Sequence, residues 1–236
     1  MKTNRIIIIL TALSLLLPVR GIAQVSEDGF RAARTGTVGL SIDEGLAWSL
    51  GSGFANIGAN NINLIQPAAT AGVFFNFSPL VRAGAYYSYT RMVRGQLTEP
   101  AADGVYYRDF KSNFHSAHVS GEVDLVEIFS KGLAHRLSVY AGAGAGLLFA
   151  NGNTNEKSCS TSYDREKMVQ TTRFAEHNAP HRYRSAYVPV TLTVEYAFLP
   201  QVSLRLAGSG RIIASKEALA PKSQVSATAG LVFNIK

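Results

Sequence analysis

The residues whose types and spacing could do chemistry most readily are His118, Ser120 and Glu122, which occupy alternate positions of one short segment. A histidine can take the proton of a serine hydroxyl while a carboxylate orients the imidazole, and this relay activates a nucleophilic serine. Side chains two and four positions apart share one face of a β-strand, so all three point to the same side of a sheet. Side chains that share a face of a strand need not be hydrogen-bonded to one another as a catalytic relay requires. We predict polar filling there and no catalytic residue.

A metal site is equally weakly supported. His177 and His181 have a spacing of four, which joins two ligands on a helix, but Pro180 opposes a helix and no third ligand is defined. Cys159 is the only cysteine, which excludes an intramolecular disulfide and any multi-cysteine zinc site. The alternating glycines at 142–146 do not precede a helix, as a phosphate-binding loop requires. We therefore predict no metal and no cofactor.

From residue 36 onward, the sequence alternates with the period of two that is typical of strands with two different faces. One row of alternate positions is apolar and contains no charge, and the other is small or polar. Segment 81–89, for example, places Arg82, Gly84, Tyr86 and Ser88 between its apolar residues. The predicted strands are centred on 38–42, 69–77, 81–89, 116–125, 137–149, 186–198, 202–214 and 224–235.

The connections between these strands alternate in length. Short turns are expected at 78–79, 130–135 and 199–201, and longer loops at 51–66, 95–112, 151–184 and 215–222. This arrangement predicts an all-β fold, an eight-stranded antiparallel up-and-down transmembrane β-barrel with short periplasmic turns and longer extracellular loops.

The beginning of the chain has the pattern of a secretory signal. Lys2 and Arg5 precede the apolar run at 6–17, and Gly21 and Ala23 are small residues suited to cleavage. The run is too short for a membrane-spanning helix, which needs about 20 apolar residues. Removal of the signal, which carries three basic residues and no acid, would lower the formal net charge from +7 to +4, a modest excess, so we expect no nucleic-acid partner. The expected divisions are a signal peptide at 1–23, a periplasmic lead-in at 24–35 and an outer-membrane barrel domain at 36–236.

Either face of such a barrel can point outward. A soluble lipocalin-like barrel places its apolar row around an internal ligand, whereas a membrane barrel turns that row toward lipid. The polar row here is rich in Gly, Ser, Thr and Ala and lacks the scattered Lys and Glu of a solvated surface, which favours the membrane. Aromatic residues of the apolar row also gather near strand ends, as an interfacial girdle requires. The predicted girdle comprises Phe75, Phe77, Tyr196, Phe198 and Phe233 at the periplasmic end and Tyr87, Tyr89 and Phe149 at the outer end.

The inward row then carries charges that need partners. An eight-stranded barrel is only wide enough to be filled by side chains, and buried charges are tolerated when they are paired. If the last short hairpin is centred on Pro200, Glu195 faces Arg205 directly. The alternative is that these charges lie in water at the mouth of the barrel. We predict a lumen charge network of Arg82, Glu122, Asp124, Arg136, Glu195 and Arg205 that plugs the barrel.

Three segments carry a resemblance to a known family: GVFFNFSP at 72–79, VPVTLTVEY at 188–196 and AGLVFNIK at 229–236. The chain resembles the small eight-stranded outer-membrane β-barrel superfamily, the OmpA/OmpX-like proteins, over nearly all of 36–236. The resemblance implies insertion by the outer-membrane assembly machinery, which typically reads a C-terminal strand ending in an aromatic residue. Here the last aromatic residue, Phe233, comes three residues before the end, a departure from that pattern.

The resemblance specifies function poorly. We expect a non-enzymatic barrel with an envelope-structural or surface-interaction role through its extracellular loops. The alternatives are a narrow pore, a lipid-modifying enzyme similar to the lipid A deacylase barrels, and the soluble ligand-binding barrel. Expected partners are outer-membrane lipid and lipopolysaccharide, and an unidentified surface protein. Basic and aromatic residues in the predicted loops suit such contacts, among them Tyr106, Tyr107, Arg108, Lys111, Lys157, Arg173, Arg182 and Arg184.

Overall fold

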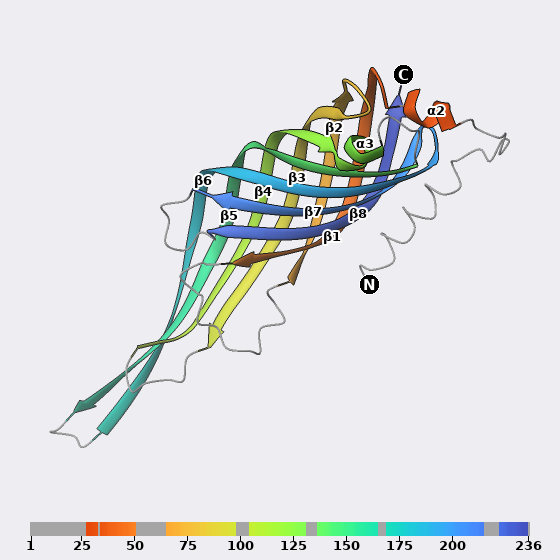
Figure 1. The fold of residues 1–236 in the computed structure, drawn as a ribbon. Coiled ribbons are helices and arrows are strands. Elements are labelled where there is room, and N and C mark those ends of the chain that lie inside the picture. The colour runs from red at the N-terminus through yellow and green to blue at the C-terminus, as the bar shows by residue number, and fades with distance from the viewer. Residues whose placement is uncertain are drawn as a thin grey trace.

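The eight predicted strands form one closed antiparallel barrel in which each strand pairs with its sequence neighbour and the last pairs with the first (Figure 1). This computed structural model describes residues 27–32, 34–50, 65–97, 104–130, 136–164, 169–214 and 222–235. The predicted signal peptide lies outside the described residues, as do most of the expected loops at 51–66 and 215–222. The strands are β1 (Thr37–Leu50), β2 (Ile65–Asn76), β3 (Val81–Leu97), β4 (Gly104–Asp124), β5 (Leu137–Asp164), β6 (Val169–Leu199), β7 (Val202–Ile213) and β8 (Ser223–Ile235).

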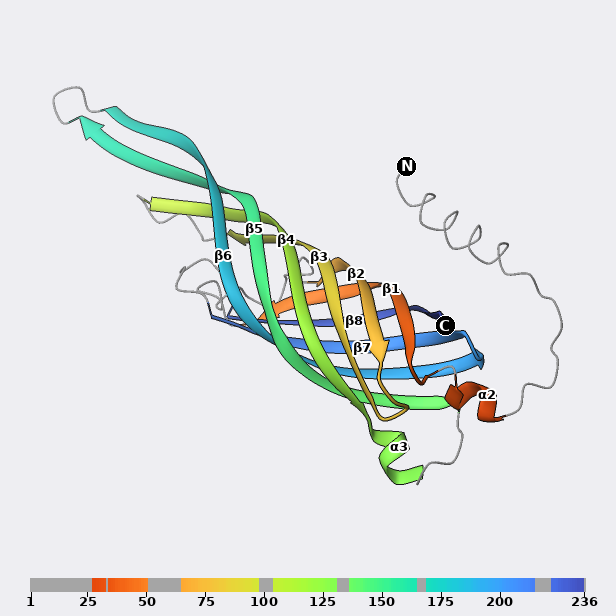
Figure 2. The ribbon, with the colours of Figure 1, turned by 90° about the horizontal axis from the view of Figure 1, so that it is seen from above.

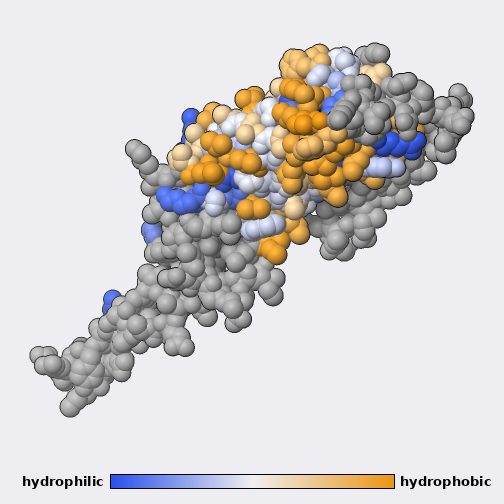
Figure 3. All heavy atoms as spheres, in the orientation of Figure 1, coloured by the Kyte–Doolittle hydropathy of each residue, from blue (hydrophilic) through white to orange (hydrophobic). Residues whose placement is uncertain are grey.

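The barrel has its apolar row on the outside. Ile42, Val119 and Leu206 are 58%, 61% and 60% exposed, whereas the inward Arg82 and Glu122 are each 1% exposed. On the face seen in Figure 3, apolar side chains cover much of the barrel, and hydrophilic ones gather toward its two ends. The expected assignment of the two faces is therefore confirmed, and the described residues do not form the apolar interior that a lipocalin-like barrel would have.

The first strand departs from the prediction. β1 extends to Leu50, well beyond the expected 38–42, and its inward row includes the buried Ser41 and Asp43. Its outward row includes Glu44, which is exposed between Ile42 and Leu46. Glu44 lies in the part of β1 beyond the predicted segment, so the charge-free apolar row that was predicted for 38–42 does not continue along the whole strand.

The largest departure concerns the expected loops at 95–112 and 151–184. Residues of both regions are paired strands: β3 continues to Leu97, β4 begins at Gly104, and β5 and β6 pair from Leu137–Tyr196 out to Asp164–Val169. β5 and β6 have 28 and 31 residues, against 12 in β2 and in β7. Their hairpin projects far beyond the other strands (Figures 1 and 2). We call this the projecting end of the barrel.

The opposite end, which we call the short-turn end, carries the tight β2–β3 and β6–β7 turns and two short helices. The helices are α2 (Glu27–Ala32), within the expected lead-in, and α3 (Leu125–Ser130), where only a turn was expected after β4. The carboxylate of Asp124 caps α3 by accepting hydrogen bonds from the amides of Val126 and Glu127 at 2.9 and 3.4 Å. Among the described helices, none is long and apolar enough to cross a membrane.

Candidate functional site

A cluster of buried charges occupies the barrel interior toward the short-turn end. Arg82 on β3 donates from Nε and Nη2 to Oε2 of Glu122 on β4, at 2.8 and 2.6 Å. Its Nη1 lies 2.9 Å from Oε1 of Glu195 on β6. Arg205 on β7 lies 3.9 Å from Glu195 and 3.8 Å from Asp43 on β1. Five strands thus contribute to one network of two cations and three anions, which we call the lumen cluster.

Aromatic rings enclose the lumen cluster. The guanidinium of Arg82 lies 3.6 Å from the ring centre of Tyr140 and 4.5 Å from that of Phe74, close enough for cation–π attraction. The hydroxyl of Tyr86 donates to Oε1 of Glu122 at 2.7 Å. Both oxygens of Glu122 therefore accept charge-assisted or phenolic hydrogen bonds, as a buried carboxylate requires.

The glycines of β5 make room for these side chains. A Cβ atom at Gly142 would lie 2.6 Å from Cγ of Glu122 and 2.7 Å from the hydroxyl of Thr191. A Cβ at Gly146 would lie 2.6 Å from both Cβ of His118 and Cζ of Tyr187. These glycines allow larger side chains from the neighbouring strands to fill a narrow lumen.

Two of the six residues predicted for the lumen charge network do not belong to the lumen cluster. Asp124 pairs with Arg34, whose Nη1 lies 3.4 Å away and also donates to the hydroxyl of Ser138. Arg136 is exposed at the short-turn end, where its guanidinium lies 4.9 Å from the ring of Phe30. Including Arg136 in the lumen network was therefore wrong, because it precedes β5 and lies outside the barrel wall. Glu195 does face Arg205 across β6 and β7, as predicted.

The partners that the sequence interpretation missed are Asp43 and Arg34. Asp43 lies on the inward row of β1, in step with Ser41, so continuing the alternation past Ile42 would have found it. Arg34 is buried in the lead-in, where no alternation identifies which side chains enter the barrel.

A second polar layer lies farther along the lumen. His118 shares a 2.9 Å hydrogen bond between its Nδ1 and the Tyr187 hydroxyl, and it stacks on Tyr86 with ring centres 5.1 Å apart. Arg211 donates to Ser116 and Gln224 at 3.0 and 3.1 Å. Beside this layer the interior retains a cavity of about 30 Å³, which is room for one or two water molecules.

The hydrogen bonds of His118 and Ser120 do not form the relay that nucleophilic catalysis needs. Ser120 lies 3.4 Å from Glu122 and is placed to donate to that carboxylate, while Nδ1 of His118 bonds Tyr187. His177 is exposed on β6 in the projecting hairpin. Among the residues that the structure describes, no three His, Cys, Asp or Glu side chains are grouped so as to hold a metal ion.

The predicted girdle residues lie on the outward side of the barrel. Phe75 and Phe77 have ring centres 4.9 Å apart near the β2–β3 turn. Closer to the projecting end, the Tyr87 hydroxyl lies 2.6 Å from Nδ1 of His115, and Tyr89 donates to Asn113 at 3.0 Å. The remaining members, which are exposed or half-buried, are Phe149, Tyr196, Phe198 and Phe233.

Comparisons with known proteins identify the fold. No protein-family model and no curated protein matches the sequence. The solved structure of Neisserial surface protein A (NspA) matches with a TM-score of 0.51 and 13% identity, over 84% of this chain and 96% of that one. Ail, the attachment invasion locus protein of Yersinia pestis, matches at 0.46 and 10% over 85% and 99% of the two chains. The N-terminal barrel domain of Pseudomonas aeruginosa OprF matches at 0.43 and 11% over 85% and 98%.

The chain has the fold of the small eight-stranded outer-membrane β-barrels, as the closed eight-stranded topology and the likeness to NspA together show. At this level of identity, the likeness identifies the fold and leaves the function to be argued from the residues of this chain.

Proposed function

We propose that this protein is a non-enzymatic barrel of the outer membrane, closed to ions, that acts at the cell surface through its projecting strands. The observation that carries the proposal is the inverted distribution of side chains: exposed apolar rows outside and buried ion pairs inside. A soluble protein would expose this apolar surface to water, whereas hydrocarbon accommodates it at no cost.

The strand lengths suit a bilayer. A tilted strand of about 9–11 residues crosses the hydrocarbon core, and β2 and β7, with 12 residues each, are sufficient. Closure of the barrel leaves no strand edge in the lipid, so every strand can satisfy its backbone hydrogen bonds within the sheet. The outward aromatic residues at the two levels would then lie at the two interfaces.

The lumen cluster argues against the pore alternative. Arg82 and Glu122 are fully buried and linked to three further strands through Glu195, Arg205 and Asp43. The adjacent cavity of about 30 Å³ has room for only one or two waters. We expect no stable conductance from the purified protein in planar bilayers. Steady ohmic steps that scale with salt concentration would favour the narrow pore instead.

The hydrogen bonding of His118 supports the non-enzymatic assignment, because Tyr187 takes the place at Nδ1 that an orienting carboxylate occupies in a catalytic relay. The lipid-modifying alternative predicts that the purified barrel changes the acylation of lipid A and that Ser120→Ala abolishes the change. We expect mass spectra of lipid A to be identical with and without the protein.

The projecting β5–β6 hairpin is the proposed contact region for a surface partner. Its strands extend the sheet well past the shorter strands, and they carry the exposed Arg173, Glu176, His177 and Asn178. Such a paired, polar hairpin can present side chains to another protein. The assembly machinery would insert the barrel with this hairpin outward.

Labelling of single cysteines on intact cells tests this orientation. In a Cys159→Ser background, we expect Asn178→Cys, in the hairpin, to react with a membrane-impermeant maleimide. The matched control is Arg136→Cys, also exposed but at the short-turn end, and it should react only after lysis. The reverse pattern would show that the short-turn end faces outward and would overturn the surface role.

A further inference from the structure

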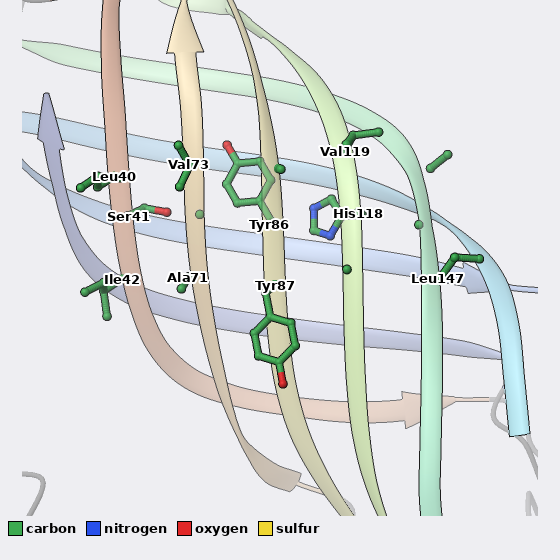
Figure 4. Close-up of a pocket in the computed structure, with 15 residues that line it drawn as sticks. Leu40, Ser41, Ile42, Ala71, Val73, Tyr86, Tyr87, His118, Val119 and Leu147 are labelled. Carbon is green, nitrogen blue, oxygen red and sulfur yellow. The ribbon is translucent and has the colours of Figure 1, made fainter. Parts of the chain in front are cut away.

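The outer wall of the barrel carries an apolar groove of about 720 Å³ across β1 to β5 (Figure 4). Small outward residues on four successive strands form its floor: Ala71, Ala85, Ala117 and Ala145. Larger side chains border it, including Val73, Val119 and Leu147. The groove is open and its surface is mostly apolar, so it can accommodate a hydrocarbon chain.

Tyr87 marks the boundary of the groove toward the projecting end. In Figure 4 its ring points away from the short-turn end. In that direction the next outward residues of β3 are Tyr89 and Arg91. Its hydroxyl is 2.6 Å from His115, whose register partners are Tyr89 on β3 and Phe149 on β5. The groove therefore ends at a row of aromatic rings, three of which, those of Tyr87, Tyr89 and His115, carry a polar group.

At and beyond the level of these rings, outward positions on three strands carry basic side chains, which we call the basic belt: Arg91 on β3, Lys111 on β4, and Arg182 and Arg184 on β6, all exposed. The strand register places them side by side. Arg184 pairs with Phe149, and its guanidinium lies 5.6 Å from that ring. One step farther out, Arg91 pairs with Asn113, Asn113 with Asn151, and Asn151 with Arg182.

No acid interrupts this surface. The outward positions of Tyr87–Arg91, Lys111–Ala117, Leu147–Asn153 and Arg182–Ala186 contain no Asp or Glu. Arg184 thus lies level with the aromatic row, three further cations and two amides lie just outside it, and the apolar groove begins on the other side of that row. An amphiphile with clustered negative charge at one end and hydrocarbon at the other is complementary to this order.

We propose that the basic belt and the groove bind a phosphorylated, multiply acylated lipid of the outer leaflet, of the lipid A type. Guanidinium groups of Arg182 and Arg184 would bind its phosphates in bidentate fashion. An acyl chain would occupy the alanine-floored groove, and Tyr87 would lie at the level where head group and chain meet. The assignment rests on the proposed outer-membrane location and names the lipid that one side of the barrel selects.

The test is binding of lipid A to the full-length barrel reconstituted in nanodiscs of zwitterionic phospholipid. We expect saturable binding that the paired substitution Arg182→Gln/Arg184→Gln weakens about thirtyfold, since each basic residue near a charged lipid contributes about fivefold. The matched control is Lys157→Gln/Arg173→Gln, which removes two cations farther out on the same hairpin. It should change the affinity by less than about twofold, because charges beyond a Debye length are screened.

A second pair of variants probes the groove. Ala117→Leu fills the floor and should weaken lipid A binding, whereas Ala227→Leu, also outward but on β8 away from the groove, should not. Equal weakening by both cation pairs would show a general electrostatic attraction and overturn the site. Equal affinity for phosphatidylglycerol would overturn the assignment to a lipid A-type ligand.

Failure of the inference is distinguishable from failure of the proposed function. Unboiled samples from the same nanodiscs should migrate differently from boiled ones if the barrel is folded in the bilayer. A folded, inserted barrel that shows no preference for lipid A overturns only the lipid site. A chain that does not insert overturns the membrane location itself.

Discussion

The arginines inside the barrel and those on its outer wall differ in their burial and in their interaction partners. Arg82 is buried against Glu122, Glu195 and the ring of Tyr140. Arg91 and Arg184 are exposed, on outward positions near the projecting end. The buried guanidinium of Arg82 is shielded from water and depends on protein partners. The exposed guanidinium groups of Arg91 and Arg184 are accessible to water and to a ligand.

This difference determines what each arginine contributes. Removing one member of a buried ion pair leaves an uncompensated charge, whereas an exposed charge contributes little to stability and remains available for binding. The interior arginines should therefore govern the free energy of unfolding, and the outer ones should govern lipid contact. The following substitutions separate the two roles.

The largest effect is expected from Arg82→Leu. It leaves Glu122 and Glu195 buried without their main cation, so we expect a loss of about 3–5 kcal/mol in the free energy of unfolding. Urea titration of the refolded barrel in lipid vesicles, followed by fluorescence of the single tryptophan, Trp48, measures this loss. Arg91→Leu is the matched control and should have little effect. Similar losses for both would contradict the division between inner and outer arginines.

The neighbouring tyrosines Tyr86 and Tyr87 sharpen the comparison, because they differ only in the face on which they lie. Tyr86→Phe removes a buried 2.7 Å hydrogen bond to a carboxylate, and we expect a loss of about 1.5–3 kcal/mol. Tyr87→Phe removes an exposed contact with His115 and should cost about 0.5 kcal/mol or less. The same urea titration tests both. A larger loss at Tyr87 would mean that the two faces are assigned backwards.

The glycines test how tightly the interior is filled. Gly146→Ala places a Cβ 2.6 Å from both His118 and Tyr187, so overpacking should destabilise the barrel by about 1–3 kcal/mol. Gly210→Ala, at an outward position of β7 with no atom within 4 Å of the added Cβ, should be neutral or slightly stabilising. Thermal or urea unfolding of the two variants compares them directly. Equal tolerance at both positions would indicate a loosely packed lumen.

The smallest effect is expected in the projecting hairpin. Lys157 lies 3.9 Å from Glu176, and both side chains are about half exposed. Lys157→Ala should change the free energy of unfolding by about 0.5 kcal/mol or less, because exposed ion pairs contribute little. A loss above about 1.5 kcal/mol would mean that the hairpin is integral to barrel stability.

The alternation of residues was sufficient to predict the barrel and most of its lumen cluster. Where a strand has an apolar outer face and a packed polar interior, period two determines the direction of each side chain, as at Arg82, Glu122 and Glu195. The same reasoning could not find the full length of β5 and β6. Beyond the barrel both faces of a strand can be polar, so the hydrophobic alternation disappears, and Pro180 suggests a loop.

The short-turn end was harder to predict for a different reason. Arg34 reaches Asp124 from outside the regular strands, and Arg136 lies just before β5 begins. The alternation of inward and outward positions along a strand does not predict the direction of such side chains, since their positions depend on the packing of α2 and α3. Asp43 could have been predicted from the sequence, because it continues the inward row of β1 past the point at which the strand was expected to end.

The most direct test of the central claim is fractionation of expressing cells, followed by gel electrophoresis of the outer-membrane fraction without and with boiling. A closed barrel in the outer membrane predicts recovery in that fraction and a difference in migration between unboiled and boiled samples. Recovery as a soluble periplasmic protein, with identical migration in both samples, would contradict the account.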